Sequence, residues 1–359
     1  MYFASLASIF GHTHGLHCPR GATGLYLATR TLLAPGSKIL VPALTCPAAV
    51  FPIVLAAAIP VACEADPSDY NTDLVALEDA LRRVPDAKAV LAVHSFGHML
   101  PMDRWAAFCR DRGLILIEDA CQALGAGWPR RPAGSWGDVS ILSFGPAKHM
   151  DRGGGAVVFS SDSELIRDMG QLLLSLPHLD HPDRLQKHYR RAYFFCDFLA
   201  KHFPFTSSLR GELGRFFSTL FVHQAGAQPP PDAMALTGFL DADLPRRAAL
   251  VEAYSSIPPM SALRLPKMLP GSNPWRYTLW VDGGHQRPLG DCLRHNGYPA
   301  SHWYPSLARG FLPSLIPTPV ADMLGEGLVN LWMDSSVTPA EATRQARVIG
   351  DYMQKHTKI

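Results

Sequence analysis

The sequence lacks a run of apolar residues long enough to cross a membrane. Its longest run extends from Ala48 to Cys63 and is interrupted by Pro52 and Pro60, whereas a spanning helix needs about 20 apolar residues. The N-terminal stretch MYFASLASIFGHTHG also lacks the basic segment that opens a secretory signal peptide. We therefore expect neither a transmembrane segment nor a signal peptide.

The chain carries little net charge and no block of like charges. Its 33 Lys and Arg residues are nearly balanced by 31 Asp and Glu residues, which gives a formal net charge of +2. A protein that holds nucleic acid through phosphate contacts needs a concentrated basic surface. The balance argues against a nucleic-acid binder and indicates a protein that acts on a small molecule.

The cysteines lack the pattern of a disulfide framework or of a zinc site. There are seven, an odd number, and no two of them are spaced as C-x-x-C. Such a pattern is typical of reduced thiols in the cytoplasm. We therefore expect a cytoplasmic protein without a metal site.

Short β-rich runs alternate with helical stretches from residue 22 to about 165. The predicted strands are Lys38–Leu44, Pro60–Ala65, Lys88–Val93, Leu114–Glu118, Val139–Phe144 and Ala156–Ser160. The predicted helices are Ala22–Leu33, Pro47–Ala58, Leu74–Val84 and Met102–Arg112. Strands that are apolar throughout and separated by helices indicate an α/β fold with three layers, in which helices cover both faces of a mostly parallel sheet of about seven strands.

The segment from 175 to about 230 has a different composition. It contains the aromatic-rich stretches HYRRAYFFCDFLAKHFPF and LGRFFSTLF and ends at Gln228-Pro229-Pro230-Pro231. One interpretation is a set of helices packed on the large domain. The other is a lid, a partner surface or a membrane-interface patch, because exposed aromatic residues usually mark a contact.

The C-terminal part has the pattern of an α+β domain. Residues 232–254 are helical in pattern, Tyr277–Val281 and Val329–Met333 are predicted strands, and Ala340–Tyr352 is a predicted closing helix. Thr338 and Glu341 form a capping box before that helix. We expect a large domain over residues 1–245 and a small one over 246–359.

Three chemically suggestive segments lie at the ends of predicted elements, where open parallel sheets bind their ligands. Asp119 and Gln122 follow one predicted strand, and Ser143 and Lys148 end or follow another. The third segment, Arg20-Gly21-Ala22-Thr23-Gly24, opens the first predicted helix. An acid, a lysine and a glycine-led helix start are what a site for pyridoxal 5'-phosphate (PLP) requires.

Each residue then has a physical role. Lys148 joins the cofactor aldehyde covalently, and Asp119 keeps the pyridine nitrogen protonated so that the ring withdraws electrons. Gln122 donates to the 3-oxygen of the ring. The phosphate lies on the backbone N–H groups of Gly21 and Ala22 at a helix N-terminus, with Ser143 adding a hydroxyl contact.

The ordinary alternatives are an Asp that only caps a helix, a solvated Lys and glycines that only form turns. A dinucleotide fold is a weaker interpretation, because Gly153-Gly154-Gly155 lies between two apolar runs and is not a G-x-G-x-x-G that opens a helix.

Further segments make the chain resemble the DegT/DnrJ/EryC1/StrS sugar aminotransferases, which are fold-type I PLP enzymes. The segments that carry the resemblance are Gly21–Ala28, Val41–Cys46, Val93–Gly97 with Met102-Asp103, Ile117–Ala123, Ser143–Lys148, and Gly297-Tyr298 with His302–Pro305. The resemblance runs from about residue 18 to 350 and leaves out 175–230.

The resemblance implies a homodimer that transfers an amino group, usually from glutamate, to a keto-sugar nucleotide or a related cyclic ketone. Lys148 is then both the covalent partner of the cofactor and the acid–base group. Cys46 falls where the family has an aromatic residue stacked on the ring, and His302 and Tyr304 fall near the substrate. His94 either ties a strand end to the fold or lies beneath the site as a substrate-proximal residue.

One family segment is not recognisable, namely the G-x-N-x-R that reaches into the neighbouring subunit. The aligned residues are His223–Gln228. Its absence leaves open another PLP-dependent reaction, such as cyclisation or elimination. A regulatory or scaffold protein without turnover, or an enzyme bound at a membrane surface, is a further alternative. A dehydratase with histidine in place of the lysine is disfavoured, because Lys148 is present.

Overall fold

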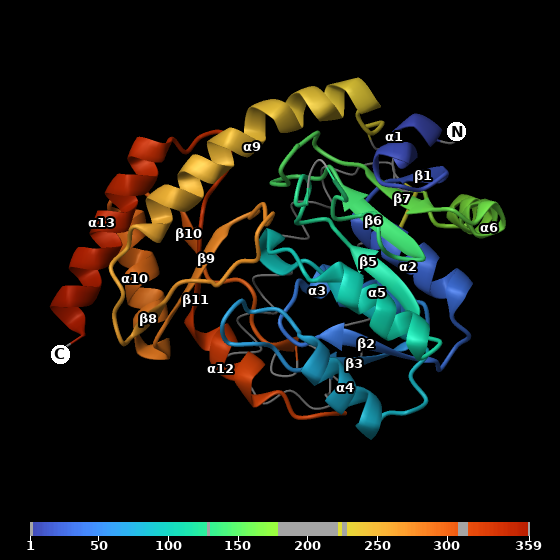
Figure 1. The fold of residues 1–359 in the computed structure, drawn as a ribbon, viewed down its shortest axis with the longest axis horizontal. Helices are drawn as coiled ribbons and strands as arrows, with labels where there is room; N and C mark the ends of the chain where they lie inside the picture. The colour runs from blue at the N-terminus through green and yellow to red at the C-terminus, as the bar shows by residue number, and fades with distance from the viewer. Residues whose placement is uncertain (1–2, 128–129, 179–221, 225–227, 308–314, 358–359) are drawn as a thin grey trace.

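The computed structural model describes residues 3–127, 130–178, 222–224, 228–307 and 315–357. Within these ranges a large sheet with helices on both faces is joined to a smaller sheet that is flanked by long helices (Figure 1). None of the described helices has the length and the apolar character that crossing a bilayer requires.

The large sheet has seven strands in the order β1-β7-β6-β5-β4-β2-β3. Their bounds are β1 His14–Cys18, β2 Lys38–Pro42, β3 Ile59–Cys63, β4 Ala89–Val93, β5 Ile115–Asp119, β6 Val139–Ser143 and β7 Ala156–Ser160. The pairs from β3 through β6 are parallel, and β7 is antiparallel to both β6 and β1. The predicted mostly parallel sheet is therefore confirmed.

Helices cover both faces of this sheet, as the alternation of side chains along each strand requires. In β4, Leu91 packs with helices α2, α3 and α6, whereas the adjacent Val90 packs with α4 and α5 on the opposite face. The helices in this part of the chain are α1 Ala4–Ile9, α2 Gly21–Leu32, α3 Pro47–Leu55, α4 Leu74–Arg83, a short 3-10 turn η1 Ser95–Gly97, α5 Met102–Asp111 and α6 Ser163–Leu174. The three-layer architecture is thus confirmed.

The second sheet has four antiparallel strands in the order β10-β11-β9-β8. Its elements are α9 Ala233–Ser255, β8 Leu263–Arg264, β9 Tyr277–Val281, α10 Gly283–His295, β10 Ala300–Ser301, α12 Pro319–Gly327, β11 Leu328–Leu331 and α13 Pro339–His356. Residues of α9, α10 and α13 share one apolar core with this sheet. The predicted capping box is present, with Thr338 and Glu341 exchanging both hydrogen bonds at the start of α13.

Helix α9 runs through the boundary predicted between residues 245 and 246. Its first half packs Leu236 and Leu240 on the large domain, and its second half packs Leu250 and Tyr254 on the small sheet. Figure 1 shows α9 extending from α1 to the neighbourhood of α13. The division into two domains remains a prediction. The aromatic-rich stretches at 188–205 and 213–221 lie outside the described residues.

A buried histidine, His98, makes stability depend on pH. Burial lowers the pKa of His98 from 6.5 to about 4, while the hydrogen bond from Nδ1 to the Asp69 carbonyl, at 2.9 Å, opposes the shift. Between those values the unfolded chain binds a proton that the folded chain does not bind, so stability rises with pH. Burial raises the pKa of the Asp69 carboxyl to about 6, which acts in the opposite direction below pH 6.

A His98→Gln variant separates the two groups. We expect the stability difference between wild type and variant to fall by about 2 kcal/mol from pH 7 to pH 5, at about 1.4 kcal/mol per pKa unit. Urea unfolding of both proteins at several pH values measures this difference. Parallel stability curves across the range would show that His98 does not titrate in the predicted way.

Candidate active site

The site is built at the carboxyl edge of the parallel strands. Asp119 is the last residue of β5, and Gln122 lies in the turn that follows; both are buried. The Asp119 carboxylate accepts a hydrogen bond from the Cys121 amide at 2.9 Å, and its backbone carbonyl accepts one from the His94 amide at 3.2 Å. The carboxylate is therefore fixed at the strand end, where the sequence analysis expects it.

Lys148 lies in the loop after β6, which ends at Ser143. Its amide donates to the Gly145 carbonyl at 3.1 Å, and its Nζ is 5.5 Å from the ring centroid of Trp275. The preceding residue, Ala147, has a left-handed backbone conformation with φ of 64°. This turn brings Lys148 back over the sheet edge, where it is half-buried.

Cys46 and Tyr304 lie beside the lysine and the acid. Burial raises the pKa of the Cys46 thiol, with the charge of Lys148 and a hydrogen bond to Tyr304 opposing the shift and the charge of Asp119 adding to it. The Tyr304 hydroxyl accepts a hydrogen bond from Gln122 Nε2 at 3.2 Å. The structure thus brings these five predicted residues into one neighbourhood.

The N-terminus of α2 closes the same site. A Cβ on Gly21 would lie 2.8 Å from Cys121 Sγ and 3.5 Å from Ser143 Cβ, so only glycine fits there without a shift. Ala22 follows and is buried. The Arg20 residue before the helix makes no side-chain capping hydrogen bond. The N–H groups of the first turn are therefore not used by a cap from this residue, and they carry the positive end of the helix dipole.

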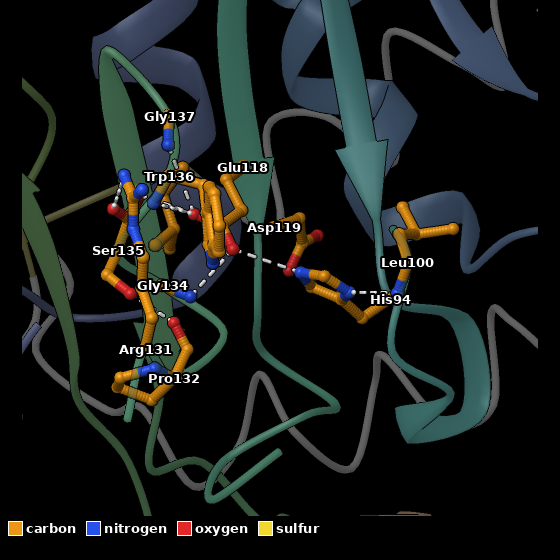
Figure 2. A network of polar contacts seen from close by, with 12 residues as sticks. His94, Leu100, Glu118, Asp119, Arg131, Pro132, Gly134, Ser135, Trp136 and Gly137 are labelled. Atoms are coloured by element: carbon orange, nitrogen blue, oxygen red, sulfur yellow. Dashed lines mark hydrogen bonds and ion pairs between the residues drawn. The ribbon is translucent and has the colours of Figure 1, made fainter. Parts of the chain in front are cut away.

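His94 belongs to a buried network centred on Glu118 (Figure 2). Its Nδ1 accepts from the Leu100 amide at 3.1 Å, so Nε2 carries the proton and donates to Glu118 Oε1 at 3.0 Å. The ring is fully buried. His94 therefore links the ends of β4 and β5 through its hydrogen bond to Glu118. Its proximity to a substrate remains a prediction.

Glu118 accepts five hydrogen bonds. Besides His94, the donors are the amides of Gly134, Trp136 and Gly137 and the hydroxyl of Ser140, at 2.7–3.2 Å. Burial raises the pKa of Glu118, but His94 and the backbone donors outweigh it, and the pKa is lowered from 4.5. A charged carboxylate next to Asp119 thus holds the loop 134–137 against β5.

His302 lies apart from the residues around Lys148. A Cβ on Gly290 of α10 would overlap His302 Nε2, so the imidazole packs on that helix. Tyr304, two residues on, instead stacks on Phe96 with ring centroids 5.6 Å apart. Of these two residues, Tyr304 therefore lies beside Gln122, and His302 lies against α10. A substrate contact of His302 remains a prediction.

The segment 273–276, which no sequence motif singles out, packs on the site from the small domain. The Trp275 amide donates to the Phe96 carbonyl at 2.7 Å, and its indole Nε1 donates to the Ala147 carbonyl. The Asn273 carbonyl accepts from His149 Nε2 at 3.0 Å. The visible signal in the sequence is the Trp-Arg pair directly before an apolar strand, but the local pattern does not say which segment this pair contacts.

Comparison with known proteins identifies the fold and the family of this chain. The aminotransferase TlmJ from Streptoalloteichus hindustanus superposes with a TM-score of 0.73 at 20% identity, covering 99% of this chain and 90% of the other. The chain therefore has the fold of the fold-type I PLP-dependent aminotransferases. It belongs to the DegT/DnrJ/EryC1/StrS aminotransferase family, whose model matches residues 3–184.

Two curated relatives are similar to the N-terminal half. A GDP-perosamine synthase from Caulobacter vibrioides is 32% identical over 166 residues, which is 46% of this chain and 44% of that protein. A UDP-N-acetyl-3-dehydro-alpha-D-glucosamine 3-aminotransferase from Acidithiobacillus ferrooxidans is 34% identical over 168 residues, 46% and 45% of the two chains. The chain thus matches less than half the length of these relatives.

Proposed function

We propose that the protein is a PLP-dependent aminotransferase that transfers an amino group, from glutamate, to a keto-sugar nucleotide or a related cyclic ketone. The observation that supports this most is the placement of Lys148 and Asp119, on separate elements, around the same pair of thiols. Both groups lie close enough to Cys46 and Cys121 to affect the pKa of each thiol: burial raises both pKa values, Asp119 adds to the rise and Lys148 opposes it.

The residues present fit PLP. The cofactor needs an amine for its aldehyde, an acid for its pyridine nitrogen and a cradle for its phosphate dianion. Lys148 and Asp119 supply the first two. The start of α2 supplies the third, because Gly21 lies so close to Cys121 Sγ that no side chain fits there and the first-turn N–H groups bind anions.

The residues of this chain then divide the work. When bound, PLP supplies an electrophilic carbon and a ring that accepts electrons from the substrate. Lys148 holds and moves the proton at its Nζ. Asp119 holds a proton on the ring nitrogen, and it is preorganised for this by the Cys121 amide. Gln122 is held by the Phe96 amide, which donates to its Oε1 at 3.0 Å, so its Nε2 is free to point toward Tyr304 and the site.

The finer assignments are part of the same proposal. The two curated relatives carry nucleotide-sugar names, which supports a keto-sugar nucleotide as acceptor. Glutamate as donor, a homodimer as the working unit and the cytoplasm as location follow from the family resemblance and from the thiol pattern. Because the G-x-N-x-R segment is not recognisable, either another residue makes the cross-subunit contact or the substrate pocket is built differently.

Isotope transfer tests the proposed function. Purified protein is incubated with PLP, [15N]glutamate and a panel of nucleotide-linked keto-sugars. The proposal predicts a product that carries the label, together with an equal amount of 2-oxoglutarate. Formation of 2-oxoglutarate without a labelled sugar would reject the acceptor class. If neither 2-oxoglutarate nor a labelled sugar forms, amino transfer is rejected in favour of a cyclisation or elimination.

The phosphate cradle gives a prediction of its own. In a Gly21→Ala variant, the new Cβ meets Cys121 Sγ at 2.8 Å, so either the thiol or the helix start must shift, and we expect the shift to disturb the phosphate cradle. We expect the dissociation constant of PLP, measured by absorbance titration, to rise by at least about tenfold, which is about 1.4 kcal/mol.

Two further variants control for the Gly21→Ala result. Removing Sγ in Gly21→Ala/Cys121→Ala opens the space, so we expect most of the affinity to return. Gly170→Ala in α6 adds a methyl group at an ordinary contact distance of 3.8 Å and is expected to leave PLP binding unchanged. Equal affinity in Gly21→Ala and wild type would place the phosphate elsewhere.

A further inference from the structure

Two arginines are buried near Lys148, and they differ in how their charges are compensated. Arg247 donates from Nε to Asp243 Oδ2 at 2.5 Å and from Nη1 to the Pro274 carbonyl at 2.9 Å. Arg276, which is 3% exposed, makes one long hydrogen bond, to the carbonyl of Trp275 at 3.4 Å. Arg247 therefore forms a structural ion pair with Asp243, whereas most N–H groups of the Arg276 guanidinium have no hydrogen-bond acceptor among the described residues.

The carboxylate nearest to Arg276 does not compensate it fully. Asp334 Oδ2 is 3.9 Å from Arg276 Nη1, which is beyond hydrogen-bond distance, and its side chain is 37% exposed. The other oxygen of Asp334 already accepts from the amide and the hydroxyl of Ser336. A buried guanidinium that is not paired is costly, so a site that retains one is suited to an anionic ligand.

The ionisable side chains described around Arg276 carry a net positive charge. Arg246 and Arg247 share the carboxylate of Asp243, and among the described residues the carboxylate nearest to Arg276 is the distant Asp334. Three guanidinium groups thus face two carboxylates. Burial lowers the pKa of Arg276 to about 10, with Asp334 opposing and Arg247 adding to the shift, so the group remains protonated at neutral pH.

Two indoles hold the guanidinium in place. Its Cζ lies 4.6 Å from the ring centroid of Trp275 and 4.4 Å from that of Trp332. Stacking on aromatic faces fixes the plane of the fork, whose edge then matches a carboxylate with two parallel hydrogen bonds. The Trp275 ring is also 5.5 Å from Lys148 Nζ, so one indole contacts both cations.

We propose that Arg276 is the binding site for a carboxylate of the substrate that reacts at Lys148. The inference rests on the proposed amino transfer and deepens it, since it names the group that the enzyme recognises. The carboxylate belongs either to a dicarboxylic amino donor or to an acidic sugar acceptor. In both cases Arg276 selects the substrate, and Lys148 carries out the proton transfer.

Binding of unreactive anions tests the site apart from turnover. The PLP-loaded protein is titrated with glutarate, which has two carboxylates and no amine, and with UDP-glucuronate and UDP-glucose, which differ in one carboxylate. Quenching of tryptophan fluorescence reports binding, because Trp275 and Trp332 flank the guanidinium. We expect Arg276→Gln to weaken either glutarate or UDP-glucuronate at least tenfold, and to leave UDP-glucose unchanged.

Two variants separate recognition from folding. Arg276→Lys keeps the charge but loses the fork, so we expect intermediate affinity. Arg264→Gln removes an exposed arginine stacked 4.6 Å from Trp280 in the same sheet and is expected to change none of the three affinities. Loss of glutarate binding identifies a donor carboxylate, and loss of UDP-glucuronate binding identifies an acceptor carboxylate.

The half-reaction with amino donors completes the test. If Arg276 binds the side-chain carboxylate of the donor, the wild type converts glutamate faster than glutamine, which lacks that group. If Arg276 binds the α-carboxylate, which both donors have, the rates with glutamate and glutamine fall equally in Arg276→Gln. If the wild type converts no amino donor, but Arg276→Gln still loses the anion binding that the wild type shows, the proposed function fails while the carboxylate site stands. Unchanged affinities for both acidic ligands in folded Arg276→Gln would overturn the site.

Discussion

Replacing Lys148 by alanine is expected to abolish both the absorbance of covalently held cofactor and amino transfer. The methyl group of alanine can neither join the aldehyde nor carry a proton, and the half-buried position beside Trp275 gives water little chance to substitute. We expect the rate of the glutamate half-reaction to fall by at least about 1,000-fold, within the range that a positioned acid–base group contributes.

Lys88 provides the matched control for Lys148. It is exposed and lies just before β4, at the amino edge of the parallel strands, whereas the site lies at the carboxyl edge. Lys88→Ala is therefore expected to retain the wild-type spectrum and rate. A Lys148→Ala protein that keeps the shifted absorbance of the bound cofactor would show that another amine holds it.

Replacing Glu118 by glutamine is expected to destabilise the fold by about 3–5 kcal/mol, as breaking a buried charge network typically does. All five partners of this carboxylate donate hydrogen bonds to it, three to Oε2 and two to Oε1. The amide group of glutamine has donors of its own, so in either orientation it faces donors and leaves them unsatisfied. Urea unfolding at pH 7 measures the loss.

Glu78 is the surface counterpart of Glu118. Its carboxylate accepts from Arg112 at 3.2 Å, and its side chain is 53% exposed. Surface pairs contribute little, so Glu78→Gln is expected to change stability by less than about 1 kcal/mol. If Glu118→Gln were as stable as Glu78→Gln, the buried network would not hold the loop 134–137 in the way the contacts indicate.

The large sheet could be predicted because its strands are short apolar runs between helices. β2, β4 and β6 lie within one or two residues of the predicted ranges. β1 was missed, because HGLHC has only two apolar side chains and gains its strand conformation from pairing with β7, more than a hundred residues later in the sequence. α10 was missed as well, because it contains Pro288 and Gly290 and is stabilised by packing on the small sheet.

The candidate site could be predicted only where it follows strand ends. Asp119 directly follows an apolar run and Lys148 lies four residues after the next predicted strand, and parallel strands bring such ends together. Trp275 was missed, because its contact with Ala147 joins residues 128 positions apart in the sequence, and Arg276, which stacks on Trp275, was missed with it. Glu118 lies within the motif Ile117–Ala123, where a charged residue inside an apolar strand predicts buried partners, but the sequence does not say which residues these are.

The most direct measurement is the ultraviolet–visible spectrum of the purified protein with PLP, before and after glutamate is added. The proposal predicts a yellow band that is absent in Lys148→Ala and is bleached by glutamate in the wild type. A band that glutamate leaves unchanged would contradict amino transfer from glutamate while retaining the cofactor site. The absence of any band with PLP would contradict the assignment of Lys148, Asp119 and the α2 N-terminus as a cofactor site.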